Sequence, residues 1–456
     1  MDFFLGVLIL AVGLILSIAL HELGHLIPAK LFKVKVSQYF VGFGKTLWST
    51  TRRGTEYGVK MLPLGGYVRM IGMFPPGKSG EDSHAEQSED ARQEERARRT
   101  GLRGMAATIV DDTRAASGSD IEEEIHPGDG TKPFYQLTMP RKLAVMFGGP
   151  VVNLIISTVL FAIILTGFGT AVPSNQLASI TPCVTSSATQ PDCSPQDEPS
   201  PAAAAGLEPG DRIVSWDGTP VSDWEDLTAD IAETGTETVE VVYERDGQQH
   251  TTSITPQLVP RPTVEDGQYV LGDDGEPVLT KQPFVGVGAS YQLYRQPLSE
   301  VPGHVGHVFT ATVHMVLTLP QRLVDIAQST FGGQERDPGV MGVIGVSRVA
   351  GQIASIDEGG YGMTERAADL MSLVASLNMA LFVFNMIPLL PLDGGHIAGA
   401  LYEGSRRRLA QLLRRADPGP VDTAKLMPLT YVVFIVLAGM SLMLAFADIV
   451  NPIKLG

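Results

Sequence analysis

The chain has 456 residues, of which 44% are hydrophobic and 18% are charged, and its formal net charge is −16. With a mean hydropathy of +0.11, it is too apolar for an ordinary soluble protein and too polar for a transporter made only of membrane helices. The composition therefore favours a membrane protein with sizeable water-exposed parts.

Four segments are long and apolar enough to cross about 30 Å of hydrocarbon as helices. We expect these transmembrane helices at 1–30, 141–168, 370–396 and 428–449. The first is not typical of a signal peptide, because MDFF offers no basic start. Basic residues flank the inner ends of these segments, namely Lys30, Lys33, Lys35, Arg141, Lys142, Arg406, Arg407, Arg408, Arg414 and Arg415. By the positive-inside rule the loops that carry them are cytoplasmic, which makes this a multi-pass protein of the inner or plasma membrane with both termini outside.

Residues 54–73 include the run EYGVKMLPLGGYVRMIGM, in which two short β-prone stretches flank Pro63, Gly65 and Gly66. This pattern predicts a β-hairpin associated with the membrane. Its high apolar content fits two placements. The hairpin either dips into the membrane boundary or forms an ordinary ribbon on the cytoplasmic face.

Residues 74–132 form a cytoplasmic insertion rich in charge, Pro and Gly, including EDSHAEQSEDARQEERARR. It has too little apolar surface to bury a core, so we expect disorder, with a solvated helix as the alternative for the charged run. We assign no chemistry to it.

The stretch after the second membrane segment is strongly acidic and is expected outside the membrane, where its charge argues against nucleic acid as a partner. Within it, AGLEPGDRIVSWDGTPV resembles a PDZ domain of the bacterial protease-associated kind, over residues 171–260. The resemblance implies an inserted α+β domain that binds an extended peptide or a substrate's external part. Cys183 and Cys193 also lie here, either as a disulfide in an oxidising compartment or as free thiols.

Residues 261–369 contain strand-like pieces and the mixed segment HVFTATVHMVLTLPQRLVDIAQ. Because Pro320 interrupts that segment, it suits an extracytoplasmic, interfacial amphipathic helix better than a fifth membrane span. His304, His307 and His314 imitate a metal-ligand pattern, but we do not expect a metal there.

The run HELGH places His21, Glu22 and His25 inside the first apolar segment. Ionisable groups at membrane depth cost several kcal/mol unless they are paired, ligated or wetted, so a function is the default hypothesis. On a helix, positions i and i+4 share one face, so both imidazoles can bind one Zn²⁺ while Glu22 accepts a proton from water. A catalytic zinc needs a third protein ligand.

Topology restricts where the third ligand lies. The first and third membrane segments run in the same direction, so their inner ends share one depth. There the third segment ends in NMIPLLPLDGGH, whose carboxylate is Asp393. Pro388 and Pro391 cannot continue a helix, and irregular backbone at membrane depth requires a protein or water surround, which a wet catalytic pocket supplies. We therefore predict Asp393 as the third ligand and leave His396 out of the set.

Three motifs in order, HELGH, FGGPVVN at 147–153 and N-x-x-P-x-x-PLDGG at 385–395, resemble the site-2 family of intramembrane zinc metalloproteases. The four spans and the domain between the second and third look most like the bacterial branch that includes the regulator of sigma E protease. The single PDZ domain and the charged insertion look closer to actinobacterial members.

The resemblance implies zinc on His21, His25 and Asp393, with Glu22 as catalytic general base and later proton donor. Asn385 and Asn153 match motif asparagines and are expected to bind substrate. Gly65 and Gly66 match a membrane-reentrant β-loop that offers an edge to an unwound substrate. The implied substrates are single-span membrane proteins such as anti-sigma factors, cut after a first protease removes their external part.

Two other classes of function would also use parts of this sequence. A membrane scaffold with a structural zinc would bind peptides through its PDZ domain, but it does not need Glu22. A metal-ion transporter would use the same three ligands in transit, but the chain shows no paired hydrophobic repeats. The sequence therefore favours a polytopic α-helical membrane protease with an inserted α+β domain.

Overall fold

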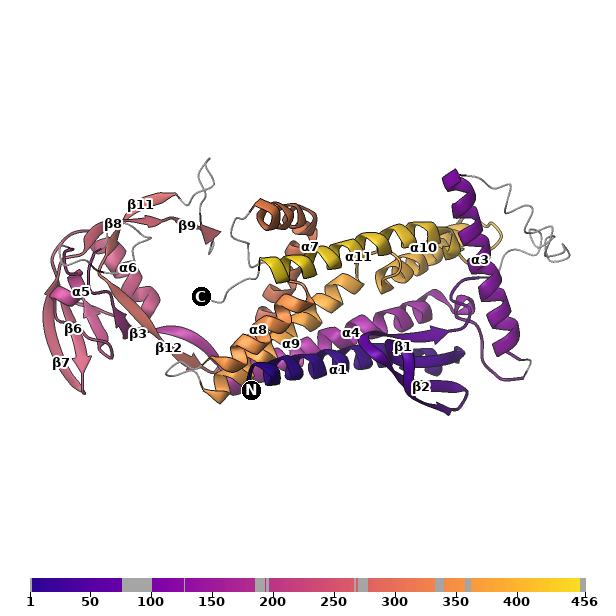
Figure 1. Cartoon of the computed structure of the whole chain (residues 1–456), viewed down its shortest axis with the longest axis horizontal. Coiled ribbons are helices and arrows are strands. Elements are labelled where there is room, and N and C mark those ends of the chain that lie inside the picture. The colour runs from indigo at the N-terminus through magenta and orange to yellow at the C-terminus, as the bar shows by residue number, and fades with distance from the viewer. Residues whose placement is uncertain are drawn as a thin grey trace. The chain divides into compact units, whose positions relative to one another are not determined.

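The computed structural model describes residues 2–75, 101–126, 128–184, 193, 197–265, 268–269, 278–332, 340–356 and 362–451. It divides into two compact units, each with its own interior (Figure 1). Unit 1 combines Met1–Phe168 with Pro297–Gly456, and unit 2 is Gly169–Gln296. Unit 2 is therefore inserted in the chain between the second and third apolar helices of unit 1.

Unit 1 consists mainly of helices. In chain order they are α1 (Asp2–Leu31), α3 (Gly101–Glu124), η2 (Phe134–Gln136), α4 (Met139–Ile163), the π-helical turn η3 (Ile164–Phe168), η4 (Leu298–Glu300), α7 (Val301–Gly332), α8 (Val343–Ser355), α9 (Met363–Asn385), α10 (Asp393–Leu412), η5 (Thr423–Leu426) and α11 (Met427–Val450). Within the described part of the chain, four stretches are long and apolar enough to cross a membrane: Asp2–Leu31, Met139–Phe168, Met363–Asn385 and Thr423–Val450. The structure therefore has four long apolar helices, as expected, although their bounds differ from the predicted ones.

Small residues bring the helices of unit 1 close together. Helix α1 packs against α4 and α8, and α9 packs against α4. A Cβ atom added to Gly24 would collide with the carbonyl oxygen of Gly148, and one added to Gly148 would collide with that of Gly24. Such close backbone approach is how helices associate where water supplies no driving force between them.

The β structure of unit 1 differs from the predicted hairpin. Strand β1 (Val36–Arg52) pairs with β2 (Thr55–Met70), and the chain turns at Arg53 and Gly54, both with positive φ. Pro63, Gly65 and Gly66 lie inside β2 rather than at the tip of a hairpin over 54–73. The residues before 54 were missed because VSQYFVGFGKTLWSTTR alternates weakly between apolar and polar positions.

Both strands also reverse direction within their length. Residues 38–41 have partners on two sides, since Val41 pairs with Gly66 and also with Val59. The sheet is tied to α1 by the Tyr39 hydroxyl, which donates to the Ala19 carbonyl oxygen at 2.8 Å. It therefore lies directly against the helix that carries HELGH.

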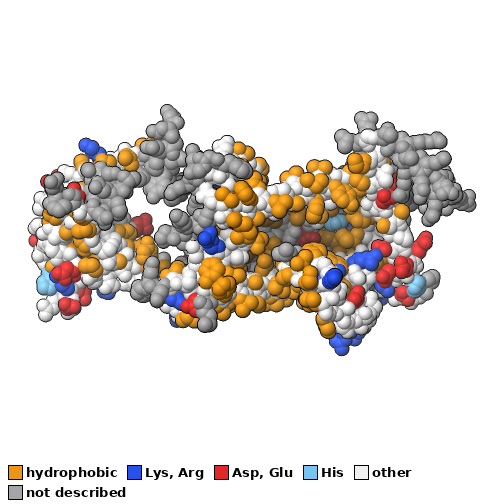
Figure 2. All heavy atoms as spheres, in the orientation of Figure 1, with side chains coloured by type: hydrophobic (Ala, Val, Ile, Leu, Met, Phe, Trp, Pro, Cys, Tyr) orange, Lys and Arg blue, Asp and Glu red, His pale blue; other side chains and the backbone are white. Residues whose placement is uncertain are grey.

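Hydrophobic side chains cover much of the visible face of the apolar helices of unit 1, whereas many charged side chains gather towards β1, β2 and α3 (Figure 2). Large apolar side chains remain outward-facing on these helices, for example Phe4 at 77% and Ile435 at 68% exposed. Because water would penalise such a surface, it suits a hydrocarbon surround.

The third apolar helix ends earlier than the predicted 370–396. Helix α9 stops at Asn385, and an irregular stretch containing Pro388 and Pro391 leads to α10, of which Asp393 is the first residue. The two prolines end the helix because they lack the N–H that continues it. Helix α10 is held to α4 by a buried ion pair, with Lys142 Nζ 2.8 Å from Glu403 Oε2.

The insertion at 74–132 contains an ordered helix, α3, where disorder was expected. Its charges pair with other parts of unit 1: Asp120 lies 2.6 Å from Arg69, and Arg114 forms an ion pair with Asp422. Tertiary charge pairing of this kind is not visible in composition. The charged run at 81–99 lies outside the described residues.

Unit 2 is an α+β unit. Its elements are β3 (Thr170–Ile180), α5 (Pro201–Ala204), β4 (Arg212–Trp216), β5 (Thr219–Pro220), α6 (Trp224–Thr234), β6 (Val239–Arg245), β7 (Gln248–Ile254), β8 (Gln257–Pro262), β9 (Val264–Glu265), β10 (Gln268–Tyr269), β11 (Leu279–Phe284) and β12 (Val287–Tyr294). The main sheet has the order β12-β3-β4-β6-β7, with β5 beside β4. Alternate side chains of β6, from Val239, Val241 and Tyr243, enter the core with Trp216 and Leu227.

Unit 2 is larger than the predicted 171–260. It continues to Gln296 because β12 pairs with β3 along most of its length. Cys183 and Cys193 form a disulfide, which resolves the two alternatives for these residues. The predicted interfacial segment 261–369 is accordingly divided between the last strands of unit 2 and helices α7 and α8 of unit 1, and α7 is not among the four membrane-length stretches found in the described residues.

Candidate metal centre

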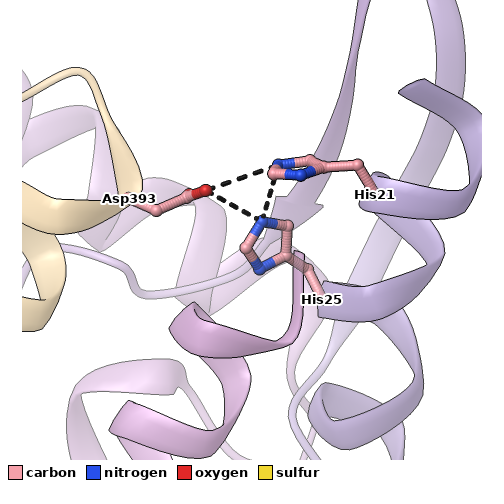
Figure 3. A group of neighbouring side chains, drawn as sticks. All are labelled: His21, His25 and Asp393. Carbon is pink, nitrogen blue, oxygen red and sulfur yellow. Dashed lines mark hydrogen bonds and ion pairs between the residues drawn. The ribbon is translucent and has the colours of Figure 1, made fainter. Parts of the chain in front are cut away.

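Three side chains from distant parts of the sequence converge in unit 1. His21 and His25 project from α1, and Asp393 faces them from the first turn of α10 (Figure 3). Asp393 Oδ2 lies 3.4 Å from His21 Nε2 and 3.3 Å from His25 Nε2. The two Nε2 atoms are 3.2 Å apart. Four-residue spacing puts both imidazoles on one face of α1, and the break after α9 brings the carboxylate to the same place.

The donor set fits a zinc ion. The three side chains are 12%, 6% and 19% exposed. Asp393 Oδ2 is buried, and no donor among the described residues meets it with hydrogen-bond geometry. A buried carboxylate oxygen directed at two imidazole nitrogens is costly unless a cation lies between them. Imidazole nitrogen and carboxylate oxygen are typical zinc ligands, and three of them leave one coordination position open.

The main chain of α4 orients His25. His25 Nδ1 lies 2.8 Å from the carbonyl oxygen of Val145. A carbonyl can only accept, so Nδ1 carries a ring hydrogen, and in the neutral ring Nε2 then has its lone pair free to bind a metal. This arrangement, in which the second ring nitrogen donates to an oxygen, is the usual support of a metal-binding histidine.

Gly149 of α4 was missed as a functional residue. A Cβ atom added there would collide with His25 Nε2 and would approach His21 Cε1 to 2.7 Å. Gly149 thus leaves the space that the two imidazoles occupy. The motif FGGPVVN contains the signal, because adjacent glycines inside an apolar helix weaken it and call for a packing reason.

We expect Gly149→Ala to lower zinc occupancy and protease activity together, because the added methyl group must displace one or both imidazoles. Zinc analysis of the purified variant measures this. Gly167→Ala is the matched control in the same membrane-length stretch, since a Cβ atom there meets nothing within 4 Å. Wild-type zinc content in Gly149→Ala would contradict the close approach.

The predicted substrate-binding residues Gly65, Gly66 and Asn385 have different surroundings in the structure. A Cβ atom added to Gly66 would lie 2.8 Å from Glu22 Cγ, so β2 passes beside the Glu22 side chain. Gly65 faces the ring of Phe43 instead, and its φ of +116° favours glycine. Asn385 ends α9, and its side chain forms no hydrogen bond within the described residues.

Asn153 is brought to the centre, but it is only 1% exposed. Its Nδ2 atom lies 3.1 Å from His21 Nδ1. His396 packs its ring against Phe74, and His304 packs against Phe161.

The chain is similar to known proteins over most or all of its length. The sequence model of the family described as Peptidase family M50 matches residues 9–415 of this chain. Zinc metalloprotease Rip1 of Mycobacterium tuberculosis is 31% identical over 462 residues, which cover 100% of both chains. Zinc metalloprotease Rip1 of Mycolicibacterium smegmatis is 30% identical over 467 residues, again 100% of both chains. Metalloprotease MmpA of Caulobacter vibrioides is 27% identical over 415 residues, 89% of each chain.

Proposed function

The chain belongs to peptidase family M50, the site-2 family of intramembrane zinc metalloproteases, and we propose that His21, His25 and Asp393 hold its zinc and that it cuts the membrane segments of single-span proteins. The observation that carries the proposal is the convergence of three metal donors, of which the two histidines lie on a helix of membrane-spanning length and composition and the half-buried Asp393 faces them from α10 (Figure 3). Family membership also sets aside the scaffold and transporter hypotheses.

Each residue of the centre has a defined task in this proposal. Bound zinc would supply Lewis-acid chemistry, polarising the substrate carbonyl and acidifying water near neutral pH. The Glu22 carboxylate, next to His21 in the chain, removes a proton from the attacking water and later delivers it to the nitrogen of the leaving amine. The side-chain amide of Asn385, which meets no partner in the described part of the chain, donates to the substrate backbone and holds the scissile carbonyl in place.

A peptide bond in a membrane helix must be unwound before it can react, and its backbone groups then need new partners. Among the described residues, positions 66–69 of β2 pair only with 38–41, which leaves their other edge without a strand. We propose that the unwound substrate adds as a strand at this edge. The contact of Gly66 with Glu22 supports this placement, because it brings the edge beside the proposed base.

We further propose that the substrates are proteins such as anti-sigma factors that have already lost their external part to another protease. The basic residues near the inner ends of α1 and α4 support a metal centre near the cytoplasmic side of the membrane. The same topology puts unit 2 outside, where its motif and α+β architecture support a PDZ-type domain that meets the substrate's external part.

Removing unit 2 should allow cleavage of an untrimmed substrate and leave cleavage of a trimmed one near the wild-type rate. The ends of the unit lie together, since Gln296 Nε2 donates to Thr170 Oγ1 at 3.1 Å. Residues 170–295 can therefore be replaced by a short Gly/Ser bridge. The reason for the expected gain is exclusion, because a folded domain outside the membrane would block bulky external parts. The domain is not needed to concentrate the substrate, since enzyme and substrate already share one membrane.

The measurement is a time course with both reconstituted single-span substrates, with the cut position read by mass spectrometry. The same deletion combined with Glu22→Gln is the control and should cut neither. If the deletion slows cleavage of the trimmed substrate and leaves the untrimmed one uncut, unit 2 captures the new carboxylate of the trimmed substrate and does not act by exclusion. Unchanged rates for both would overturn a gating role for unit 2, and cuts outside the membrane segment would contradict intramembrane cleavage.

A further inference from the structure

One residue beside the metal centre has no role in the proposed reaction, although its position is among the most enclosed in the protein. Asn153 of α4 is 1% exposed, so a substrate chain cannot reach its side chain without a rearrangement of the helices. Its Nδ2 atom lies 3.1 Å from His21 Nδ1, while its Oδ1 atom is buried and meets no donor among the described residues. A buried amide in such a place calls for a partner on each side.

The tautomer of His21 decides which end of the amide belongs at the ring. His21 Nε2 faces Asp393 Oδ2 at 3.4 Å and His25 Nε2 at 3.2 Å, so it is the nitrogen turned towards the proposed metal. A nitrogen that binds metal must keep its lone pair, and the ring hydrogen of a neutral imidazole is then on Nδ1. An Nδ1–H group cannot accept a hydrogen bond from the amide N–H of Asn153.

A half-turn of the amide resolves the conflict. The oxygen and the NH₂ group of an asparagine have nearly the same shape, so rotation about the last side-chain bond exchanges them without moving another residue. Asn153 Oδ1 then accepts from His21 Nδ1–H. In either orientation one end of the amide has no partner, so the count of hydrogen bonds does not decide between the two orientations. The metal decides, because it needs the Nε2 lone pair and thereby puts the ring hydrogen on Nδ1.

We infer that, in the zinc-bound protein, Asn153 presents its Oδ1 atom to His21 Nδ1–H and acts as a positioning residue that fixes the ring in its metal-binding tautomer. The inference rests on the proposed ligand set. It replaces the substrate-binding role expected from the motif resemblance.

The spacing on α4 supports the inference. Val145, Gly149 and Asn153 are four residues apart and share one face of the helix. Val145 gives a carbonyl oxygen to His25 Nδ1, Gly149 leaves room for both rings, and Asn153 places its side-chain amide 3.1 Å from His21 Nδ1. One helix face thus supplies the second hydrogen bond of each histidine, and only the one from Asn153 can be removed by changing a side chain.

The test measures zinc affinity of the purified full chain by competition with a chelator. We expect Asn153→Ala to weaken zinc binding by about 10–100-fold, the usual effect of removing such a partner. Asn153→Asp should bind zinc at least as tightly as the wild type, because a carboxylate accepts from Nδ1–H and cannot donate. Ser157→Ala is the matched control, since Ser157 lies one turn further along α4 and is equally buried; its affinity should be unchanged.

Three results would overturn the inference. An equal loss of zinc affinity in Asn153→Asp and Asn153→Ala would mean that the amide N–H, and not the oxygen, contacts His21. Wild-type affinity in Asn153→Ala would mean that the residue positions nothing. Equal loss in Ser157→Ala and Asn153→Ala, with lowered thermal stability of both metal-free variants, would assign the effect to helix packing. Failure of the ligand set itself is distinguished by His21→Ala, which would then retain zinc.

Discussion

Replacing Glu22 by Gln is expected to leave about one zinc per chain in place and to lower the rate of cleavage by about 10²–10⁴-fold, the typical contribution of a positioned general acid or base. The amide keeps the size and hydrogen-bonding capacity of the carboxylate but cannot take a proton from water. The three metal donors are untouched, because the cluster consists of His21, His25 and Asp393. The rate is measured with a trimmed single-span substrate in reconstituted membranes, alongside zinc analysis of the same preparation.

Glu56→Gln is the matched control for this loss of charge. Glu56 lies on β2, accepts a hydrogen bond from Gln38 at 3.2 Å and stands outside the metal cluster, so its replacement should leave cleavage near the wild-type rate. Wild-type cleavage by Glu22→Gln would remove Glu22 from the mechanism. Loss of zinc together with activity in Glu22→Gln would instead make the carboxylate part of the metal site.

Asp393→Ala is expected to remove most of the zinc and, with it, essentially all activity. Three protein ligands are the minimum of a catalytic zinc site, so the loss of one leaves little affinity. His21→Ala and His25→Ala should behave in the same way. Elemental analysis of purified protein gives the zinc-to-chain ratio directly.

Asp417→Ala controls for the removal of a carboxylate beyond the end of α10. That side chain is 64% exposed, lies 3.5 Å from Arg407 Nε and accepts a hydrogen bond from the Gly419 N–H, so zinc content should not change when it is removed. Full zinc occupancy in Asp393→Ala would exclude Asp393 as the third ligand. His396, directly after the LDGG motif, and Asn153, at the end of FGGPVVN, would then be tested as the third zinc ligand.

Much of the metal centre could be predicted from local spacing. His21 and His25 are four residues apart in an apolar helix, so their common face follows from the helix repeat alone. Asp393 required an argument from topology. The structure brings Asp393 to the two histidines, and the direction of the spans stays a prediction from the basic residues at their ends. The position of the α9 end and the start of α10 at Asp393 itself were not predicted.

The contribution of α4 to the metal centre could not be predicted from local spacing in the sequence. Nothing in FGGPVVN states that Gly149 faces two imidazoles or that Asn153 touches His21 rather than substrate. These facts depend on how deeply α4 packs into α1, and that depth is set by the mutual approach of Gly24 and Gly148. The pairing of β1 with both halves of β2 is likewise a property of the assembled sheet.

The sequence by itself therefore determined the class of molecule, the four membrane helices, the HELGH pair and the family, because each is encoded by short-range spacing or by apolar length. Only the tertiary structure decided which residues of α4 lie against the two histidines, which partners Asp120 and Arg114 of α3 find, and where unit 2 ends. The physical reason is that a helix repeat or an apolar run is fixed along the chain, whereas contacts between distant segments depend on which small residues allow close approach and which charges find partners.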